Sequence, residues 1–90
     1  MNTWHVYLLQ CADGTYYCGV ATDIRRRIDQ HNGNLPGGAK YTRSRRPVKL
    51  LVSRECETKS MAYSLEHVIK SSPRAEKLGV LNSSDWRASH

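Results

Sequence analysis

A small set of side chains in this sequence carries the groups that cleavage of a phosphodiester requires. Two tyrosines, an arginine, a histidine and a glutamate stand out by type and position, namely Tyr7, Tyr17, Arg27, His31 and Glu66. Such cleavage needs a base for the attacking water, cations beside the developing negative charge, and a metal or acid at the leaving oxygen. A Ser-His-Asp arrangement, a phosphate-binding glycine loop and a paired-carboxylate motif do not stand out in the sequence.

Arg27 and His31 lie on the apolar face of a helix that the sequence predicts over residues 21–33. A buried arginine without a partner is very costly, so Arg27 must reach a partner or line a cleft. The plainer alternative is an ion pair with Asp23, one helical turn earlier. For His31, the plainer alternative is a contact with the carbonyl groups at the end of the helix.

Glu66 lies at the edge of an apolar stripe on a second predicted helix, over residues 57–72. A carboxylate in such a place often reaches solvent or pairs with a lysine, and periodicity alone favours that interpretation. The functional alternative is a ligand for a hard cation, because Mg²⁺ sites that face phosphate often use only one or two carboxylates.

The rest of the pattern predicts the elements that position these residues. Apolar runs bounded by turn residues predict strands over residues 4–10, 15–20 and 48–55. A third helix is predicted over residues 73–81, after a Ser-Pro start signal. The order β-β-α-β-α-α predicts an α+β fold, a small three-stranded antiparallel sheet flanked by three helices. We expect one domain over residues 1–82 and a polar tail over 83–90.

The first two predicted strands form a hairpin whose register decides whether the tyrosines share a face. A two-residue turn would pair Tyr7 with Val20 and place Tyr7 and Tyr17 on opposite faces. A three-residue loop over 12–14, with its glycine left-handed, pairs Tyr7 with Gly19 instead. We therefore predict the three-residue loop or a bulge.

The net charge of +6 is concentrated in two clusters. One cluster is Arg25, Arg26 and Arg27, and the other is Lys40, Arg43, Arg45, Arg46 and Lys49. A solvated basic surface is the plain alternative, but clustered cations also bind phosphates through counterion release. We predict contact with a nucleic-acid backbone by Lys40, Tyr41, Arg43, Arg45 and Arg46. Within this segment Tyr41 and Thr42 are expected to approach the site, and simple loop packing is the alternative for Tyr41.

The cysteines and the hydropathy pattern bear on the compartment. Three cysteines without paired spacing indicate reduced thiols, with neither disulfides nor a zinc site. No apolar run is long enough to cross a bilayer, and the first residues do not form a signal peptide. We expect a cytoplasmic protein without membrane contact, as a monomer or weak homodimer.

Several segments together resemble the GIY-YIG nuclease domain. The two short motifs correspond to "HVY" at 5–7 and "YCG" at 17–19, followed by the helix "TDIRRRIDQHN" and by the glutamate of "AYSLEHVIK". The resemblance covers residues 4–82 and is closest to the bacterial stand-alone, single-domain branch. Members of that branch show segments similar to "CADGTYYCGVATDI", "GAKYTRSRRPVKLL" and "RAEKL" in the same order.

The resemblance implies roles for the candidate residues. Of Tyr7 and Tyr17, one is expected to act as the general base or to position it. Arg27 matches the arginine that stabilises the phosphate charge, and His31 matches a helper in proton transfer or phosphate contact. A free phenol has a pKa of about 10, and we expect a nearby guanidinium and metal to lower it.

Two further residues match the family pattern and two depart from it. Glu66 matches the single carboxylate that holds a divalent metal, Mg²⁺ or Mn²⁺, and Gly19 matches the motif glycine that leaves room at the site. His5 stands where the first motif has glycine, and Cys18 stands where the second has isoleucine.

The resemblance implies a metal-dependent endonuclease acting on DNA, with branched or damaged DNA in repair or recombination as the suggested substrate. RNA is left open as the other nucleic acid. The alternative is a catalytically weak nucleic-acid-binding module, or a protein that binds a repair factor, that retains the fold.

Overall fold

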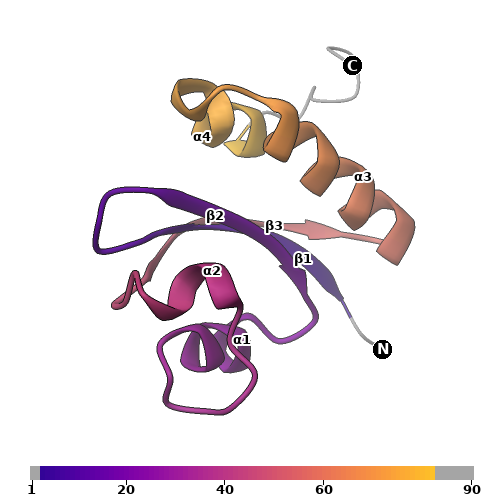
Figure 1. Cartoon of the computed structure of the whole chain (residues 1–90). Coiled ribbons are helices and arrows are strands. Elements are labelled where there is room, and N and C mark those ends of the chain that lie inside the picture. The colour runs from indigo at the N-terminus through magenta and orange to yellow at the C-terminus, as the bar shows by residue number, and fades with distance from the viewer. Residues whose placement is uncertain (1–2, 83–90) are drawn as a thin grey trace.

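A computed structural model describes residues 3–82 of the 90-residue chain. The elements, labelled in Figure 1, are β1 (Trp4–Gln10), β2 (Tyr16–Ala21), α1 (Ile24–His31), α2 (Lys40–Arg43), β3 (Lys49–Cys56), α3 (Lys59–Ser71) and α4 (Arg74–Asn82). The predicted order is confirmed, with the single turn of α2 added inside the segment expected to be a loop. A helix this short has no periodicity to reveal it. The predicted tail over 83–90 lies outside the described residues.

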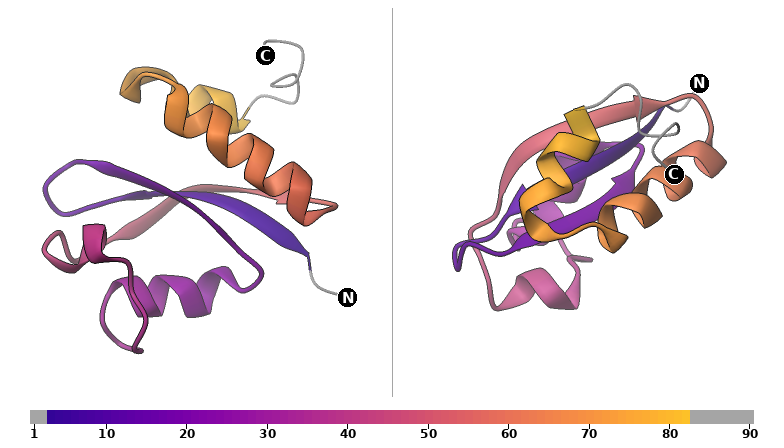
Figure 2. Two further views of the ribbon diagram at one scale, coloured as in Figure 1. Left: turned by 45° about the vertical axis from the view of Figure 1, so that its right-hand side comes forward. Right: turned by 90° about the horizontal axis from the view of Figure 1, so that it is seen from above.

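The three strands form one antiparallel sheet in the order β2-β1-β3, so β1 is central and β2 is an edge strand. Helices α3 and α4 cover one face, and α1 and α2 lie against the other (Figure 1). The turned views in Figure 2 show the same separation into layers. Groups from α1 and α3 therefore approach the sheet from opposite sides.

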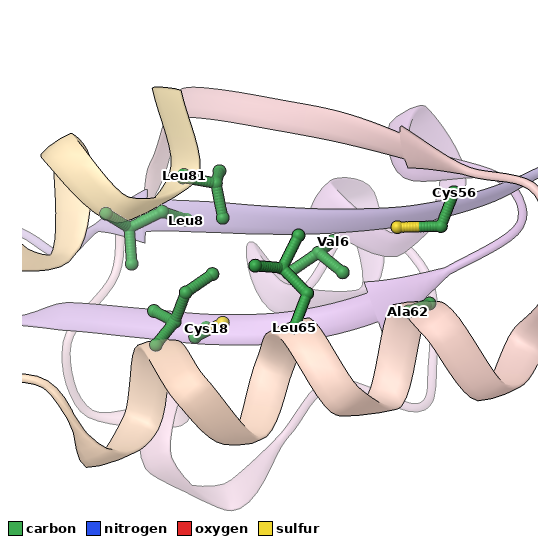
Figure 3. Close-up of a cluster of buried hydrophobic side chains, with 8 residues drawn as sticks. Val6, Leu8, Cys18, Cys56, Ala62, Leu65 and Leu81 are labelled. Atoms are coloured by element: carbon green, nitrogen blue, oxygen red, sulfur yellow. The ribbon is translucent and has the colours of Figure 1, made fainter. Parts of the chain in front are cut away.

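The larger core lies between the sheet and the pair α3 and α4. Buried side chains from both layers point into it, namely Val6, Leu8, Cys18, Cys56, Ala62, Leu65, Ile69 and Leu81, most of which are labelled in Figure 3. Thr58 caps the start of helix α3, because its side chain accepts a hydrogen bond from the backbone N–H of Met61. Capping and an apolar stripe thus fix the helix that carries Glu66.

The second core lies under α1 and contains Tyr7. Tyr7, Leu9, Cys11 and Val48 are buried there, with Ile24 and Ile28 of α1 packed against them. Asp23 caps the start of α1 by accepting from the backbone N–H of Arg26 at 3.0 Å. At the other end, the Asn32 amide donates to the carbonyl of Val48 and accepts from its N–H. These two hydrogen bonds tie the end of α1 to the start of β3.

The hairpin has the predicted three-residue loop over 12–14. The N–H of Cys11 donates to the carbonyl of Thr15 at 2.8 Å, and Gly14 has a φ of +83°. This left-handed conformation favours glycine. The resulting register pairs Tyr7 with Gly19, as predicted.

The three cysteines are buried and are not joined by disulfides. Among the helices of residues 3–82, none combines the length and the apolar character that crossing a bilayer would take.

Candidate active site

Tyr7 occupies the centre of the sheet and lies over a glycine. It is 1% exposed, and a Cβ atom added at Gly19 would fall 2.6 Å from its Cζ atom. Since real Cβ atoms do not come so close to a neighbour, any larger residue at position 19 would displace the tyrosine ring. The motif glycine therefore leaves the space that the phenol occupies.

His31, the last residue of α1, joins Tyr7 to a second polar residue. Its Nε2 atom lies 2.9 Å from the Tyr7 hydroxyl, and its Nδ1 atom lies 2.9 Å from the Thr42 hydroxyl. His31 and Thr42 are both fully buried. The ring of His31 thus contacts two hydroxyl groups across the layer, rather than only the carbonyl groups at the helix end.

Burial sets the protonation of this pair. It raises the pKa of Tyr7 to about 12, although the hydrogen bond and charge of Arg27 act in the opposite direction. Burial, with the charges of Arg27 and Arg46, lowers the pKa of His31 to about 4. Arg27 lowers the pKa of Tyr7, as expected, but desolvation outweighs this effect, so the pKa lies above its ordinary value. At neutral pH both groups are uncharged.

Arg27 is held by groups of its own layer. Its Nη1 atom donates to the Gln30 side chain at 2.9 Å and to the Gly37 carbonyl at 2.7 Å. Asp23 caps the start of the helix, and among residues 3–82 no ion pair joins Asp23 to Arg27. With both N–H bonds of Nη1 used, those of Nε and Nη2 are left for Tyr7 and for an anion. The sequence analysis did not predict this role of Gln30, although its i+3 spacing from Arg27 is a signal for such a pair.

Tyr17 connects this buried pair to the surface. Its ring meets the edge of the His31 ring at 5.0 Å between centroids and lies 5.7 Å from the ring of Tyr41. Tyr41 is 39% exposed, and the Arg45 guanidinium lies 4.1 Å above its ring. An aromatic row therefore runs from His31 through Tyr17 and Tyr41 to a cation.

Glu66 is not brought together with the other four residues. It comes from α3, on the opposite side of the sheet, and its carboxylate pairs with Lys70 at 3.5 Å. Within residues 3–82 no hydrogen bond or ion pair joins it to Tyr7 or Arg27. It does act on Cys18 of β2, whose pKa is raised to about 12 by burial and further by the charge of Glu66. Glu66 therefore approaches the same edge strand from the other face.

Among the described residues, Glu66 is a single carboxylate without further metal ligands grouped around it. The Glu66 side chain is 18% exposed, and no group of three histidine, cysteine, aspartate or glutamate residues in the described range could hold a metal. A single carboxylate suits Mg²⁺ or Mn²⁺ when water and substrate phosphate supply the remaining oxygen ligands.

The predicted phosphate-contacting residues fall into two groups. Lys40 and Arg43 of α2 are exposed, and within residues 3–82 neither side chain forms an ion pair. Arg45 instead pairs with Asp13 at 3.0 Å and donates to the Tyr41 carbonyl. Arg46 donates to the carbonyl of His31 at 2.6 Å, so it holds the end of α1.

Comparison with known proteins identifies the family. The model of the GIY-YIG catalytic domain matches residues 3–78. A UPF0213 protein of Desulfotalea psychrophila is 45% identical over 82 residues, which are 91% of this chain and 74% of that protein. A UPF0213 protein of Halobacterium salinarum is 48% identical over 73 residues, which are 81% of this chain and 92% of that protein.

Solved structures agree with the fold. The solution NMR structure of a UPF0213 protein from Bacillus halodurans is 36% identical and has a TM-score of 0.54, covering 99% of this chain and 94% of that chain. That of a protein from E. faecalis is 35% identical with a TM-score of 0.63, covering 100% and 95%. The chain therefore belongs to the GIY-YIG family, a family of nucleases, and its relatives are proteins of the UPF0213 group.

Proposed function

We propose that this protein is a metal-dependent endonuclease that hydrolyses phosphodiester bonds in DNA, with branched or damaged DNA as its substrate in repair or recombination. One observation carries the proposal. The phenol of Tyr7 is buried within 2.9 Å of a neutral imidazole and beside a guanidinium, an arrangement suited to moving a proton next to a phosphate.

In the proposed reaction, water attacks phosphorus while Tyr7 takes the proton of the water. The hydroxyl proton of Tyr7 passes to Nε2 of His31, 2.9 Å away, so no free phenolate has to form. The water oxygen bonds to phosphorus, the bond to the leaving 3′ oxygen breaks, and that oxygen takes up a proton from solvent. The imidazolium of His31 then loses its proton to solvent, and the enzyme returns to its starting state.

Arg27 stabilises the charge that develops on the phosphate oxygens. Its Nη1 group is fixed by Gln30 and by the carbonyl of Gly37, so the remaining N–H bonds are oriented before substrate arrives. Preorganised donors of this kind stabilise a transition state without reorganisation. Tyr17 packs against the His31 ring and helps to keep it in place.

Glu66 would hold the divalent metal, Mg²⁺ or Mn²⁺. When bound, the metal supplies Lewis-acid stabilisation at the phosphate and at the leaving oxygen. β2 is an edge strand, and in this proposal the nucleic-acid backbone would lie along its outer side and contact groups from both layers. The ion pair of Glu66 with Lys70 would have to open or be shared, which favours loose metal binding without DNA.

The test is a cleavage assay on plasmid and branched DNA, with and without Mg²⁺ or Mn²⁺. Glu66→Ala and Arg27→Ala should each lower the cleavage rate by at least about 100-fold. The matched controls are Glu76→Ala and Arg26→Ala, which remove the same groups at exposed positions of α4 and α1 and should cleave at nearly the wild-type rate.

Cleavage that survives both site substitutions would contradict the proposal. DNA binding without cleavage in any metal would favour the alternative of a nucleic-acid-binding module that retains the fold.

A further inference from the structure

We propose that Thr42 is a positioning residue of this site, which fixes the tautomer of His31 and so sets the direction in which Tyr7 gives up its proton. The inference rests on the proposed function, because the direction matters only if Tyr7 relays a proton during hydrolysis. The hydrogen bonds that lead to it can nevertheless be tested in the protein alone.

The donors and acceptors around Thr42 allow one arrangement. Its hydroxyl oxygen lies 2.9 Å from the Ala39 carbonyl, which can only accept, so the hydroxyl proton points there. The same oxygen lies 2.9 Å from Nδ1 of His31. Since its only proton is already used, the oxygen must accept at this contact, and Nδ1 must carry the ring proton.

The other ring nitrogen then has a defined role. Because the pKa of His31 is lowered to about 4, the ring is neutral at pH 7 and carries a single ring proton. With that proton on Nδ1, Nε2 is bare and accepts from the Tyr7 hydroxyl at 2.9 Å. The chain of hydrogen bonds therefore runs in one direction, from Tyr7 through His31 and Thr42 to Ala39.

Because Thr42 is buried, water cannot take the place of its hydroxyl group. Thr42 and His31 are fully buried, so solvent has no access to substitute for the hydroxyl. Within residues 3–82, the Thr42 hydroxyl is the hydrogen-bond partner of Nδ1. Without it, Nδ1–H would lose its acceptor, and the tautomer with the proton on Nε2 would become competitive.

The two tautomers differ in their effect on Tyr7. In the assigned tautomer, the phenol proton has an acceptor, and the phenol oxygen, which also accepts from Arg27, keeps one lone pair for water. In the other tautomer, Nε2–H would donate to that oxygen, and the phenol proton would have no base at 2.9 Å. Proton transfer from water through Tyr7 would then stop at the first step.

The first measurement is the tautomer itself, read from ¹⁵N chemical shifts of the His31 ring in ¹⁵N-labelled protein at pH 7. The wild type should show a protonated Nδ1 and a bare Nε2. Thr42→Ser, which keeps the hydroxyl, should show the same pattern. Thr42→Val, which keeps a similar shape without the hydroxyl, should show loss of that tautomer or a mixture.

Protonated Nε2 in the wild type would overturn the proposal, and this reading needs no variant if the valine protein does not fold. An unchanged tautomer in folded Thr42→Val would overturn it as well.

Single-turnover cleavage of DNA is the second measurement. Thr42→Val should cleave roughly 100-fold more slowly than the wild type, and Thr42→Ser should restore most of the rate. Full activity in Thr42→Val would contradict the role of Thr42 and leave the nuclease proposal standing. The assigned tautomer in a wild-type protein that cleaves no DNA would instead contradict the nuclease proposal and leave the tautomer assignment intact.

Discussion

The pairing of Tyr7 with His31 depends on both groups being neutral in a buried place. Each would be easier to charge in water, and burial shifts the two pKa values in opposite directions, to about 12 for Tyr7 and about 4 for His31. Both side chains are therefore uncharged at neutral pH before substrate binds. Under the proposed function, we expect proton transfer to become favourable when a phosphate and a metal change the local field.

The lowered pKa of His31 predicts a pH dependence of stability. In the unfolded chain the pKa of His31 is about 6.5. Between pH 6.5 and pH 4 the unfolded state therefore binds more protons than the folded state, and the free energy of unfolding decreases as the pH is lowered. Tyr7, whose pKa is raised to about 12, stays neutral throughout this range. Urea unfolding at pH 7.5 and pH 5 should show the wild type losing about 2 kcal/mol more than His31→Gln. Equal losses in the two proteins would contradict the shift.

At the scale of elements, the hairpin register brings the two tyrosines to one face. Register follows from loop length, because a shift of one residue moves every side chain to the other side. The three-residue loop places Gly19 opposite Tyr7, and the absent side chain leaves room for the phenol. A turn far from the site thus decides which groups can meet in it.

This close packing predicts opposite effects for two glycine substitutions. Gly19→Ala should destabilise the protein by about 1–3 kcal/mol, because its Cβ would fall against the ring of Tyr7. Gly79→Ala in α4 has no atom within 4 Å of the new Cβ, so it should stabilise by about 0.5–1 kcal/mol. Urea unfolding measures both. A Gly19→Ala protein as stable as the wild type would contradict the packing of Tyr7 over position 19.

Much of the fold follows from local signals in the sequence. Asp23 and Thr58 are residue types that favour helix starts, and they cap α1 and α3. The predicted order of the strands along the chain and the predicted three-residue hairpin loop are confirmed. Helix α2 was not predicted, because one turn has no periodicity. Its start is held by the Thr42 hydroxyl bound to Ala39, a contact without a pattern in the sequence.

The site was harder to predict than the fold. The apolar face of α1 places Arg27 and His31 on the same side of the helix. The carbonyl of Gly37, which accepts from Arg27, could not be predicted, because every residue has a backbone carbonyl and the sequence does not single this one out. The direction of the Tyr7 pKa shift depends on depth of burial, which the sequence does not give. Glu66 lies in the layer on the other face of the sheet, and only the packing of the helices on the sheet shows this.

At the scale of the whole molecule, the two layers divide the work. The layer of α1 and α2 carries Tyr41 and the exposed cations Lys40 and Arg43, and Tyr17 of β2 faces this layer beside the buried pair. The layer of α3 and α4 supplies the larger core and Glu66. A nucleic acid bound along the first layer would be drawn there by its phosphates.

This division predicts which cations set the salt dependence of DNA binding. Arg43→Gln should lower the slope of log affinity against log salt by about 0.9 for a duplex. Lys59→Gln, which removes the same charge from exposed Lys59 of α3, should leave the slope unchanged. Binding titrations at several salt concentrations measure both. A larger change for Lys59 than for Arg43 would move the binding surface to the other layer.

The measurement that tests the proposed nuclease chemistry most directly is single-turnover cleavage of DNA by Tyr7→Phe in Mg²⁺. Phenylalanine keeps the ring over Gly19 and removes only the hydroxyl that contacts His31. We predict a cleavage rate at least about 100-fold below that of the wild type, with unchanged DNA affinity. A Tyr7→Phe protein that cleaves at the wild-type rate would contradict the role of Tyr7 in moving the proton of the attacking water.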